Sequence, residues 1–232
     1  MFRKDGVAAV VPAAGRGRRF GGKIPKPFVR VLGKPLFIHT LRALRAAYAF
    51  SEIVLVVDAT RLVRARRWVR FSRFDKVRVV SGGATRAASV KNGLLALSGL
   101  VRLVAVHDAA RPLVPASVVR RTLNAAKKSG AAICALPVSS TVKRVNARTG
   151  AVQKTEDRDR LVLAQTPQVF DKALLLSRYR ALRARALRAT DEAALFDGTR
   201  TRVRIVKGDE KNFKVTTKKD LERMKQILRN GG

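Results

Sequence analysis

From residue 6 to residue 108, short apolar runs rich in β-branched residues alternate with amphipathic helical patterns. This alternation predicts an α/β fold with a mostly parallel sheet that is covered by helices on both faces. Ligands of such sheets bind beyond the carboxyl ends of the strands. Chemistry is therefore expected in the segments that follow the runs GVAAVVP (6–12), EIVLVVD (52–58), KVRVVSG (76–82) and RLVAVHD (102–108), and in PVSSTVKRV (137–145).

The alternation ends at Pro137, where a different pattern begins. TVKRVNARTGAVQKTEDR (141–158) has two β-prone segments around an Asn-to-Gly turn, which predicts a β-hairpin. Because an isolated hairpin is only marginally stable in water, we expect residues 139–158 to form a projecting arm that packs on a second subunit. The chain then returns through LVLAQTPQVF (161–170) to a terminal helix that begins near residue 218. A length of 232 residues predicts a single domain, 1–232, into which the arm is inserted.

The chain is very basic, with 50 Lys and Arg against 16 Asp and Glu and a formal net charge of +34. Such a charge attracts polyanions whatever the fold. The cations are spread through helical patterns, such as 61–74 and 177–189, which favours arginine-coated helix surfaces facing solvent. A nonspecific polyanion surface is the alternative. No helix-turn-helix, zinc-finger or RNA-binding aromatic signature supports sequence-specific nucleic-acid binding.

Two features predict a cytoplasmic protein that does not contact the membrane. The single cysteine, Cys134, has no partner for a disulfide, which suits a reducing compartment. No apolar stretch reaches the roughly 20 residues that are needed to span a bilayer.

A glycine-rich loop, AAGRGRRFGGK (13–23), follows the first apolar run directly. Its glycines fit neither the phosphate-binding P-loop nor the dinucleotide fingerprint. Its small residues do allow backbone N–H groups to converge on an anion, and several cations lie beside them. Pro25 and Pro27 restrict the backbone that presents Lys26. The loop therefore predicts a triphosphate site.

Several motifs, in order along the chain, resemble those of one enzyme family. They are VVPAAGRGRRF (10–20), PKPFVRVLGKPLFIHTL (25–41), SGGATRAASVKNGL (81–94), VHDAARPLV (106–114), TVKRV (141–145), AQTPQVF (164–170), TDEA (190–193) and GDEKNFKVTTKKDL (208–221). Together they resemble the 2-C-methyl-D-erythritol 4-phosphate cytidylyltransferases, CTP-dependent enzymes of non-mevalonate isoprenoid synthesis. The resemblance implies a Rossmann-like nucleotidyltransferase fold. Two positions depart from the family pattern: Pro27, where Gln is more frequent, and Ser140, where Asp is usual.

The reaction that the resemblance implies is attack of a polyol phosphate on the α-phosphorus of CTP, with release of pyrophosphate. A phosphate monoester is already an anionic nucleophile, so the protein must align two anions and stabilise the charge that develops between them. Cations and a divalent metal, Mg²⁺ or another, can do this. The sequence accordingly shows no Ser-His-Asp or Cys-His constellation and no cluster of zinc ligands.

The resemblance also implies roles for individual residues, with a homodimer in which the arm completes the neighbouring site. The implied catalytic cations are Arg19, Lys26, Arg158 and Lys214. The implied nucleotide-binding residues are Pro12, Ala13, Ala14, Gly15, Arg18, Gly82, Gly83, Arg86, Ser89 and Ala109, with Ala13, Ala14 and Gly15 acting through backbone N–H groups and Gly82, Gly83 and Ser89 reading cytosine. The implied substrate-binding residues are Asp108, Arg111, Thr141 and Thr166.

Asp108 is also the expected ligand of the metal, because it follows a buried strand and should emerge at the pocket floor. We expect His107 to be a packed, hydrogen-bonded residue, not a base. Asp191 and Glu192 are interpreted as hydrogen-bonding residues near a helix start, with metal binding as the less favoured alternative.

Three other functions stay open at this point. Ribitol 5-phosphate cytidylyltransferases share the fold and the chemistry but use another polyol phosphate, and a sugar-nucleotide pyrophosphorylase would use another base. The different-class alternative is a nonspecific nucleic-acid-binding protein, suggested by the net charge alone.

Overall fold

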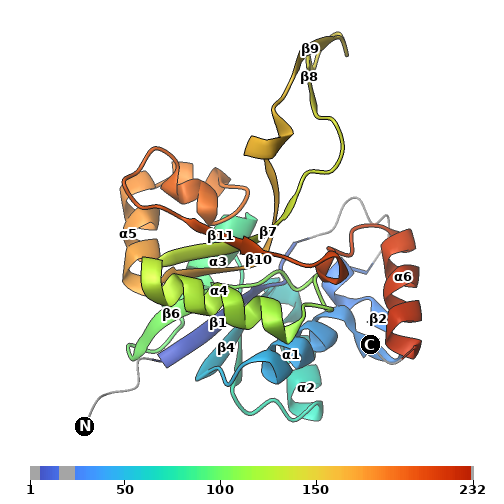
Figure 1. The fold of residues 1–232 in the computed structure, drawn as a ribbon. Coiled ribbons are helices and arrows are strands. Elements are labelled where there is room, and N and C mark those ends of the chain that lie inside the picture. Colours follow the sequence, from blue (N-terminus) through green and yellow to red (C-terminus); the bar gives the residue numbers. More distant parts are fainter. Residues whose placement is uncertain (1–5, 16–23, 231–232) are drawn as a thin grey trace.

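The computed structural model describes residues 6–15 and 24–230. Its centre is a seven-stranded sheet with the strand order β11-β7-β10-β6-β1-β4-β5 (Figure 1). The strands are β1 (Gly6–Pro12), β4 (Glu52–Val57), β5 (Val77–Ser81), β6 (Val101–Val106), β7 (Ala131–Pro137), β10 (Val162–Asp171) and β11 (Arg204–Lys207). All neighbouring pairs are parallel except those of β10, which runs antiparallel to β6 and β7. The predicted α/β class and mostly parallel sheet are confirmed.

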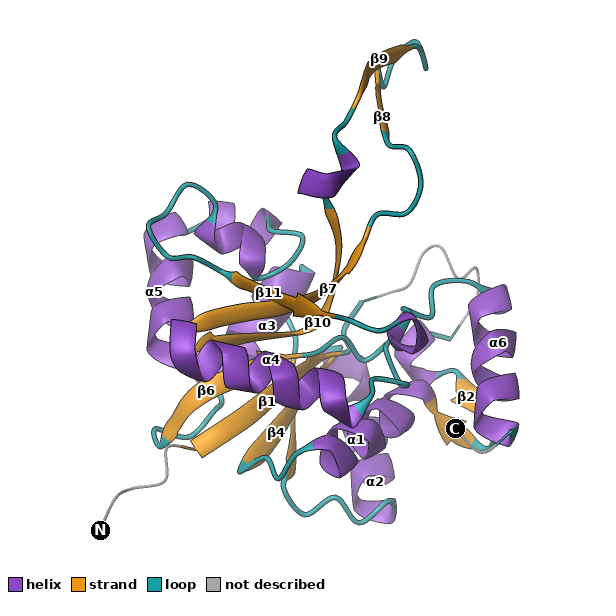
Figure 2. Cartoon of the chain, in the orientation of Figure 1, coloured by secondary structure: helices purple, strands orange, loops and turns teal. Residues whose placement is uncertain are grey.

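Helices cover both faces of this sheet (Figure 2). They are α1 (Leu36–Ala47), α2 (Leu62–Phe71) and α4 (Ala116–Ser129) on one face, and α3 (Arg86–Leu95) and α5 (Lys172–Leu182) on the other. The side chains of β1 alternate between two cores: Ala9 and Val11 pack with the first group of helices, Ala8 and Val10 with the second. Burial on both faces explains why β1 is a continuous apolar run, not an alternating one.

A third, smaller core joins the C-terminal helix to the segment after the glycine-rich loop. Helix α6 (Lys218–Arg229) begins at the predicted position, where Thr217 and Asp220 form a capping box. Its residues Leu221 and Met224 pack with Val31 and Leu36, next to the two-stranded sheet of β2 (Arg30–Val31) and β3 (Lys34–Pro35).

Strand β10 decides which residues meet at the site. The sequence indicates only that the chain returns through 161–170, and in the structure this segment is a strand inserted between β6 and β7. Gln168 is in register with Val106, so the middle of β10 lies beside the carboxyl end of β6. The hydroxyl of Thr166 accepts a hydrogen bond from the backbone N–H of Asp108 at 3.1 Å.

The predicted hairpin is present as a projecting arm (Figure 1). It consists of β8 (Lys143–Val145) and β9 (Val152–Thr155), paired antiparallel. The side chain of Asn146 accepts hydrogen bonds from the next residues of the turn, and Gly150 has φ +71°. Two apolar arm residues are strongly exposed, Val145 at 50% and Val152 at 62%. Within one protomer the arm therefore has no core of its own.

Short 3-10 helices connect the main elements: η2 (Lys26–Phe28), η3 (Ala59–Arg61), η4 (Arg158–Arg160), η5 (Arg185–Arg188), η6 (Ala193–Phe196) and η7 (Glu210–Asn212). The arginines of α2 face outward as expected, because Ala65 and Val69 are buried while Arg66, Arg67 and Arg70 are exposed. Within the described ranges 6–15 and 24–230, no helix combines the length and apolar character that crossing a membrane requires.

Candidate active site

A cavity of about 150 Å³ opens beyond the carboxyl ends of β1 and β6. Five segments of the sequence contribute to it: the turn after β1, the start of η2, helix α3, the turn after β6, and the chain before α6. Its lining residues are Pro12, Ala13, Ala14, Gly15, Lys26, Pro27, Arg86, Ser89, Asp108, Ala109, Ala110 and Lys214. Ten of these twelve belong to the site that the sequence predicts; Pro27 and Ala110 are additional.

The turn after β1 forms one wall of the cavity. The backbone N–H of Ala13 donates to the carbonyl of Val56 at 2.7 Å and so extends the pairing of β1 with β4. This corrects the expectation that Ala13 offers its N–H to the nucleotide. Ala14 and Gly15, which follow it, are partly buried and exposed respectively. Arg18 and Arg19, the predicted phosphate contact and catalytic cation, lie outside the described residues.

Lys26 stands on the opposite wall, at the first position of η2. The carbonyl of Pro25 accepts from Phe28 N–H at 2.8 Å, and the carbonyl of Lys26 itself accepts from Val29 N–H at 3.1 Å. Phe28 is buried and packs edge-on against Phe37, with ring centroids 5.2 Å apart. The backbone of Lys26 is therefore fixed by a tight turn and a core aromatic residue.

Glycines allow the predicted cytosine-reading segment to pack against the turn after β1. A Cβ at Gly82 would lie 2.6 Å from the Cβ of Ala14, and a Cβ at Gly83 would lie 2.6 Å from the Cβ of Ala88. Contacts this short do not occur in real structures, so a side chain at Gly82 would push this segment away from the turn after β1, and one at Gly83 would clash with the start of helix α3. The hydroxyl of Ser89 accepts from Gly83 N–H at 3.1 Å, and Thr85 caps helix α3 by accepting from Ala88 N–H.

Arg86 differs most from its predicted role. Sequence reasoning assigns it to the nucleotide, whereas in the structure its guanidinium lies between two carboxylates. Its Nε donates to Asp108 Oδ1 at 3.0 Å, and its Nη atoms donate to Glu192 at 2.9 to 3.1 Å. Burial by itself lowers the pKa of Arg86, but these two carboxylates outweigh burial and the net pKa is raised. Arg86 is therefore charged, and it also lines the cavity.

Asp108 carries the negative charge of the cavity floor. Its Oδ1 faces Arg86, and its Oδ2 lies 2.6 Å from Lys214 Nζ. Burial raises the pKa of this carboxyl, but the attraction of Arg86 and Lys214 more than offsets burial and holds the pKa well below its usual range. Asp108 is therefore ionised at any physiological pH.

Lys214 lies in the connection between η7 and α6. The residues around it resemble a strand in sequence, but they do not form one in the structure. Val215 N–H donates to the carbonyl of Ala110 at 2.8 Å. The buried side chain of Asn212 donates to the carbonyl of Thr166 at 2.8 Å and to Gln165 Oε1 at 3.2 Å. Asn212, which lies in the motif 208–221 but was assigned no role from the sequence, thus ties this connection to β10.

His107 is a packed residue, as expected. It is fully buried, with Nε2 at 3.0 Å from the carbonyl of Arg111 and Nδ1 at 3.1 Å from the hydroxyl of Thr166. Burial lowers the pKa of His107 to about 4. The ring is therefore neutral at pH 7, and its hydrogen bonds fix the turn that presents Asp108.

The predicted substrate-binding residues are not all brought to this cavity. Arg111 donates to the carbonyl of Asn212 at 2.6 Å, and Thr166 is 4% exposed with its hydroxyl bonded to the Asp108 backbone. Thr141 and Arg158 are exposed on the arm, where Arg158 donates to the carbonyl of Ser139 at 2.9 Å. None of these four is among the described residues that line the cavity.

The donors for a metal ion are few in this part of the molecule. Over residues 6–15 and 24–230, no group of three or more His, Cys, Asp and Glu side chains is arranged to hold a metal. Asp108 supplies the one carboxylate among the described lining residues.

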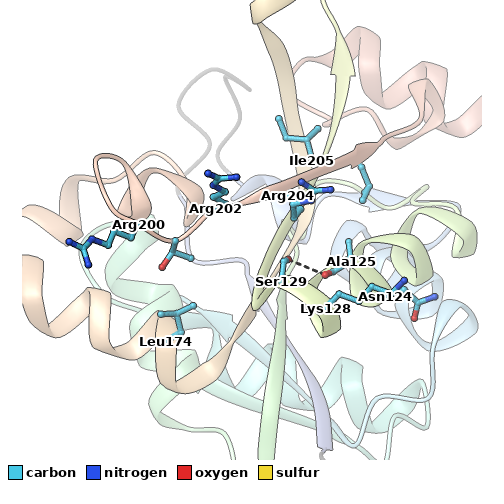
Figure 3. A pocket seen from close by; sticks show the side chains of 11 residues that line it. Asn124, Ala125, Lys128, Ser129, Leu174, Arg200, Arg202, Arg204 and Ile205 are labelled. Atoms are coloured by element: carbon cyan, nitrogen blue, oxygen red, sulfur yellow. Dashed lines mark hydrogen bonds between the residues drawn. The ribbon is translucent and has the colours of Figure 1, made fainter.

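A second cavity, of about 810 Å³, lies between α4, α5 and β11 (Figure 3). We call it the basic groove; its residues are Asn124, Ala125, Lys128, Ser129, Leu174, Arg200, Thr201, Arg202, Arg204, Ile205 and Val206. Four of them are cations and none of those described is acidic. The Ser129 hydroxyl donates to the carbonyls of Ala125 and Ala131. The groove therefore offers positive charge but no group arranged for catalysis.

Comparison with known proteins points to a single enzyme family. The family model described as 2-C-methyl-D-erythritol 4-phosphate cytidylyltransferase matches residues 7–230. A protein of that name from Dehalococcoides mccartyi is 38% identical over 232 residues, 100% of both chains. Another, from Xylella fastidiosa, is 43% identical over 94% of this chain and 95% of the relative.

Solved structures of similar proteins share the fold of this chain. The crystal structure of 4-diphosphocytidyl-2C-methyl-D-erythritol synthase from Anaerococcus prevotii superposes with a TM-score of 0.84 at 30% identity, covering 97% of this chain and 99% of the other. A family model that spans nearly the whole described chain, together with full-length relatives, decides the assignment. The chain belongs to the 2-C-methyl-D-erythritol 4-phosphate cytidylyltransferase family of nucleotidyltransferases.

Proposed function

We propose that the protein transfers CMP from CTP to 2-C-methyl-D-erythritol 4-phosphate, and that the transfer takes place in the cavity at the ends of β1 and β6. The products are 4-diphosphocytidyl-2-C-methyl-D-erythritol and pyrophosphate. Family membership supports the reaction. The observation that carries the location is that Lys26, Asp108 and Lys214, from three distant segments, line one cavity.

The chemistry of this cavity suits two anionic reactants. The phosphate of the acceptor attacks the α-phosphorus in line, and the leaving pyrophosphate departs on the opposite side. Charge grows on the α-phosphoryl oxygens and on the leaving group, so fixed cations lower the barrier without a general base. We assign this stabilisation to Lys26 and Arg19, and the grip on the acceptor phosphate to Lys214 and Arg158.

The nucleotide is held by the loop after β1 and by the turn before α3. We assign the triphosphate to the backbone N–H groups of Ala14 and Gly15, together with Arg18, and the cytosine edge to Gly82, Gly83 and Ser89. Pro12, Ala13 and Ala109 form the wall beneath. The close approach of Gly82 to Ala14 supports this assignment, because it brings the base-reading and phosphate-binding segments next to each other.

A divalent cation such as Mg²⁺ fits the oxygen donors that the cavity and the bound CTP would offer. Mg²⁺ is usually held by one or two carboxylates together with substrate phosphates and water, and Asp108 supplies one carboxylate at the cavity floor. Bound there with CTP, the ion would neutralise charge on the phosphates. Asp108 itself stays ionised because Arg86 and Lys214 flank it, and we assign to it the acceptor's hydroxyl groups as well.

We further propose a homodimer in which the arm of one subunit completes the site of the other. Exposed apolar residues on the arm, Val145 and Val152, support an interface there. Arg158 and Thr141 belong to the same arm. Arg111 and Thr166 lie beside Asp108, the residue at the floor of the cavity. A cytoplasmic location remains a prediction, which rests on the unpaired, buried Cys134.

The acceptor distinguishes this function from its nearest rival. With purified protein, CTP and Mg²⁺, we expect pyrophosphate release to be faster with 2-C-methyl-D-erythritol 4-phosphate than with ribitol 5-phosphate. The same assay with ATP, GTP and UTP tests the base. Faster release with ribitol 5-phosphate, or with a purine nucleotide, would contradict the proposal.

Mixed dimers test the contribution of the arm. Lys26→Ala and Arg158→Ala are each expected to be nearly inactive as homodimers. A dimer that combines one subunit of each kind has one site with both residues intact, so it should recover about half of the wild-type rate. Co-expression with two affinity tags isolates this dimer. If Arg158 acts within its own subunit, the mixed dimer stays as inactive as its parents.

A second candidate function, nonspecific polyanion binding, is favoured by the basic groove. Its cations Lys128, Arg200, Arg202 and Arg204 are exposed, and the whole chain carries a net charge of +34. We expect retention of a single-stranded oligonucleotide that weakens steeply as salt rises. Replacing the three arginines by glutamine should reduce retention and leave cytidylyl transfer unchanged, whereas Lys26→Ala should do the reverse. Loss of both properties in either variant would contradict this separation.

A further inference from the structure

Behind the cavity lies a buried carboxylate that the proposed reaction does not use directly. Glu192, in the TDEA segment (190–193), is 0% exposed and precedes η6. It is not among the described residues that line the cavity. A buried carboxylate costs free energy even when it is paired, and an apolar residue of similar size would fill the same space without that cost. The presence of a charge here therefore needs an explanation.

Both oxygens of Glu192 accept hydrogen bonds from Arg86, and Oε1 also accepts one from the Tyr179 hydroxyl at 3.5 Å. Oε1 accepts from Arg86 Nη1 at 2.9 Å, and Oε2 accepts from Nη1 and Nη2 at 3.1 Å. Arg86 presents its N–H groups in a planar fork, so a paired carboxylate fixes the direction of the whole guanidinium. The Nε edge then faces Asp108: Nε donates to Oδ1 at 3.0 Å, and Nη2 also lies 3.0 Å from the same oxygen.

Glu192 is itself held rigidly by the central strand β10. Gln168 Oε1 accepts from the backbone N–H of Glu192 at 3.0 Å and of Ala193 at 3.1 Å. Gln168 Nε2 donates to Asp191 Oδ2 at 2.8 Å. The orientation is thus transmitted from β10 through the TDEA segment to Arg86, and from Arg86 to the cavity floor.

We propose that Glu192 is a positioning residue: by holding the Nη groups of Arg86 it fixes the direction in which the guanidinium meets Asp108, and so fixes the Asp108 carboxylate in the cavity. The two carboxylates also balance Arg86 and Lys214. Without Glu192, the guanidinium of Arg86 would be free to turn Nη1 as well onto Asp108 or toward the nucleotide phosphates. This inference rests on the proposed role of Asp108 in the reaction.

Glu192→Gln tests the proposal, because it keeps the shape of the side chain and removes its charge. We expect kcat to fall by about 10- to 100-fold, the usual effect of losing a residue that orients a catalytic group. The Kd for CTP, measured by calorimetry, should stay unchanged or become tighter, because Arg86 gains freedom to contact phosphate. A variant with wild-type kcat, or one with weaker CTP binding and unchanged kcat, would overturn the inference.

Two comparisons separate positioning from a merely structural role. Asp171→Asn is the matched control, because Asp171 caps α5 by accepting from Leu174 N–H and binds neither Arg86 nor Glu192; it should lower Tm and leave kcat unchanged. In an Arg86→Gln background, Glu192→Gln should lower kcat no further than about twofold if it acts through Arg86. Additive losses in this cycle would contradict the proposal.

Should Glu192→Gln fail to fold, Arg86→Lys tests the same bridge. Lysine keeps the positive charge but cannot bind two carboxylates in a fork, so a comparable loss of kcat supports the inference and a wild-type kcat overturns it. The proposed function is tested separately by the wild-type enzyme. Absence of cytidylyl transfer there would contradict the function, whereas an active wild type with an equally active Glu192→Gln contradicts only the positioning role.

Discussion

Lys26→Ala is expected to lower kcat for cytidylyl transfer by about 10³-fold while the Kd for CTP changes by no more than a few fold. The reason is that the negative charge near Lys26 grows as the α-phosphorus passes through the transition state. Other groups around the nucleotide keep it bound in the ground state. The backbone at Lys26 is fixed by Pro25 and by the buried Phe28, so its position is already set before CTP arrives. Single-turnover kinetics and calorimetry measure the two quantities separately.

The matched control for this variant is Lys219→Ala, which removes an exposed lysine from α6 outside the cavity. It should leave both kcat and Kd unchanged. If Lys26→Ala weakened CTP binding as much as it lowered kcat, Lys26 would be a ground-state binding group and the assigned role would be wrong.

Asp108→Asn is expected to abolish transfer and also to destabilise the protein by about 1 kcal/mol, because Lys214, whose side chain is 36% exposed, loses its carboxylate partner. Arg86 would keep Glu192, but Lys214 would lose the carboxylate that lies 2.6 Å from its Nζ. Urea unfolding at pH 7 measures the loss of stability. Asp75→Asn, at an exposed aspartate before β5, is the control and should have no effect on either property.

The stability difference between wild type and Asp108→Asn should depend on pH in a defined direction. The pKa of Asp108 is lowered in the folded protein, so its contribution is fully present above the unfolded pKa of a carboxyl, about 4, and is lost as pH falls toward the folded value. The difference should therefore be constant from about pH 6 to about pH 8, a range well above the unfolded pKa of about 4. It should shrink when the pH falls below about 4. A difference that grows as pH falls would contradict the assignment of Asp108 as an ionised group.

Much of the fold could be predicted from local patterns. The alternation of apolar runs and amphipathic helices specified the parallel part of the sheet, because burial on one or both faces sets the spacing of apolar residues. The Asn-to-Gly turn specified the hairpin of β8 and β9, because Gly150 adopts a positive φ and the Asn146 side chain accepts backbone hydrogen bonds of the turn. Pro25 and Pro27 specified a fixed backbone around Lys26, because a proline ring fixes its own φ and restricts the preceding residue.

The position of β10 could not be predicted in this way. The sequence indicates only that the chain returns through 161–170, because the antiparallel insertion of β10 between β6 and β7 depends on contacts with segments that are distant along the chain. Asn212 and Gln165, which tie the Lys214 segment to β10, lie within the motifs 208–221 and 164–170 but were assigned no role from the sequence for the same reason. Arg86 was placed on the nucleotide because its neighbours resemble a base-reading segment, and nothing near it in sequence reveals Glu192.

The sequence by itself determined the fold class, the family and the residue types gathered at the strand ends, because these follow from hydrophobic periodicity and short motifs. Only the tertiary structure decided that Arg86 bridges Asp108 and Glu192, that the N–H of Ala13 belongs to the sheet, and that Lys214 reaches the cavity from a connection, not from a strand. The physical reason is that ion pairs and hydrogen bonds are directional contacts between distant segments. Their partners are fixed only when the sheet order has brought those segments together.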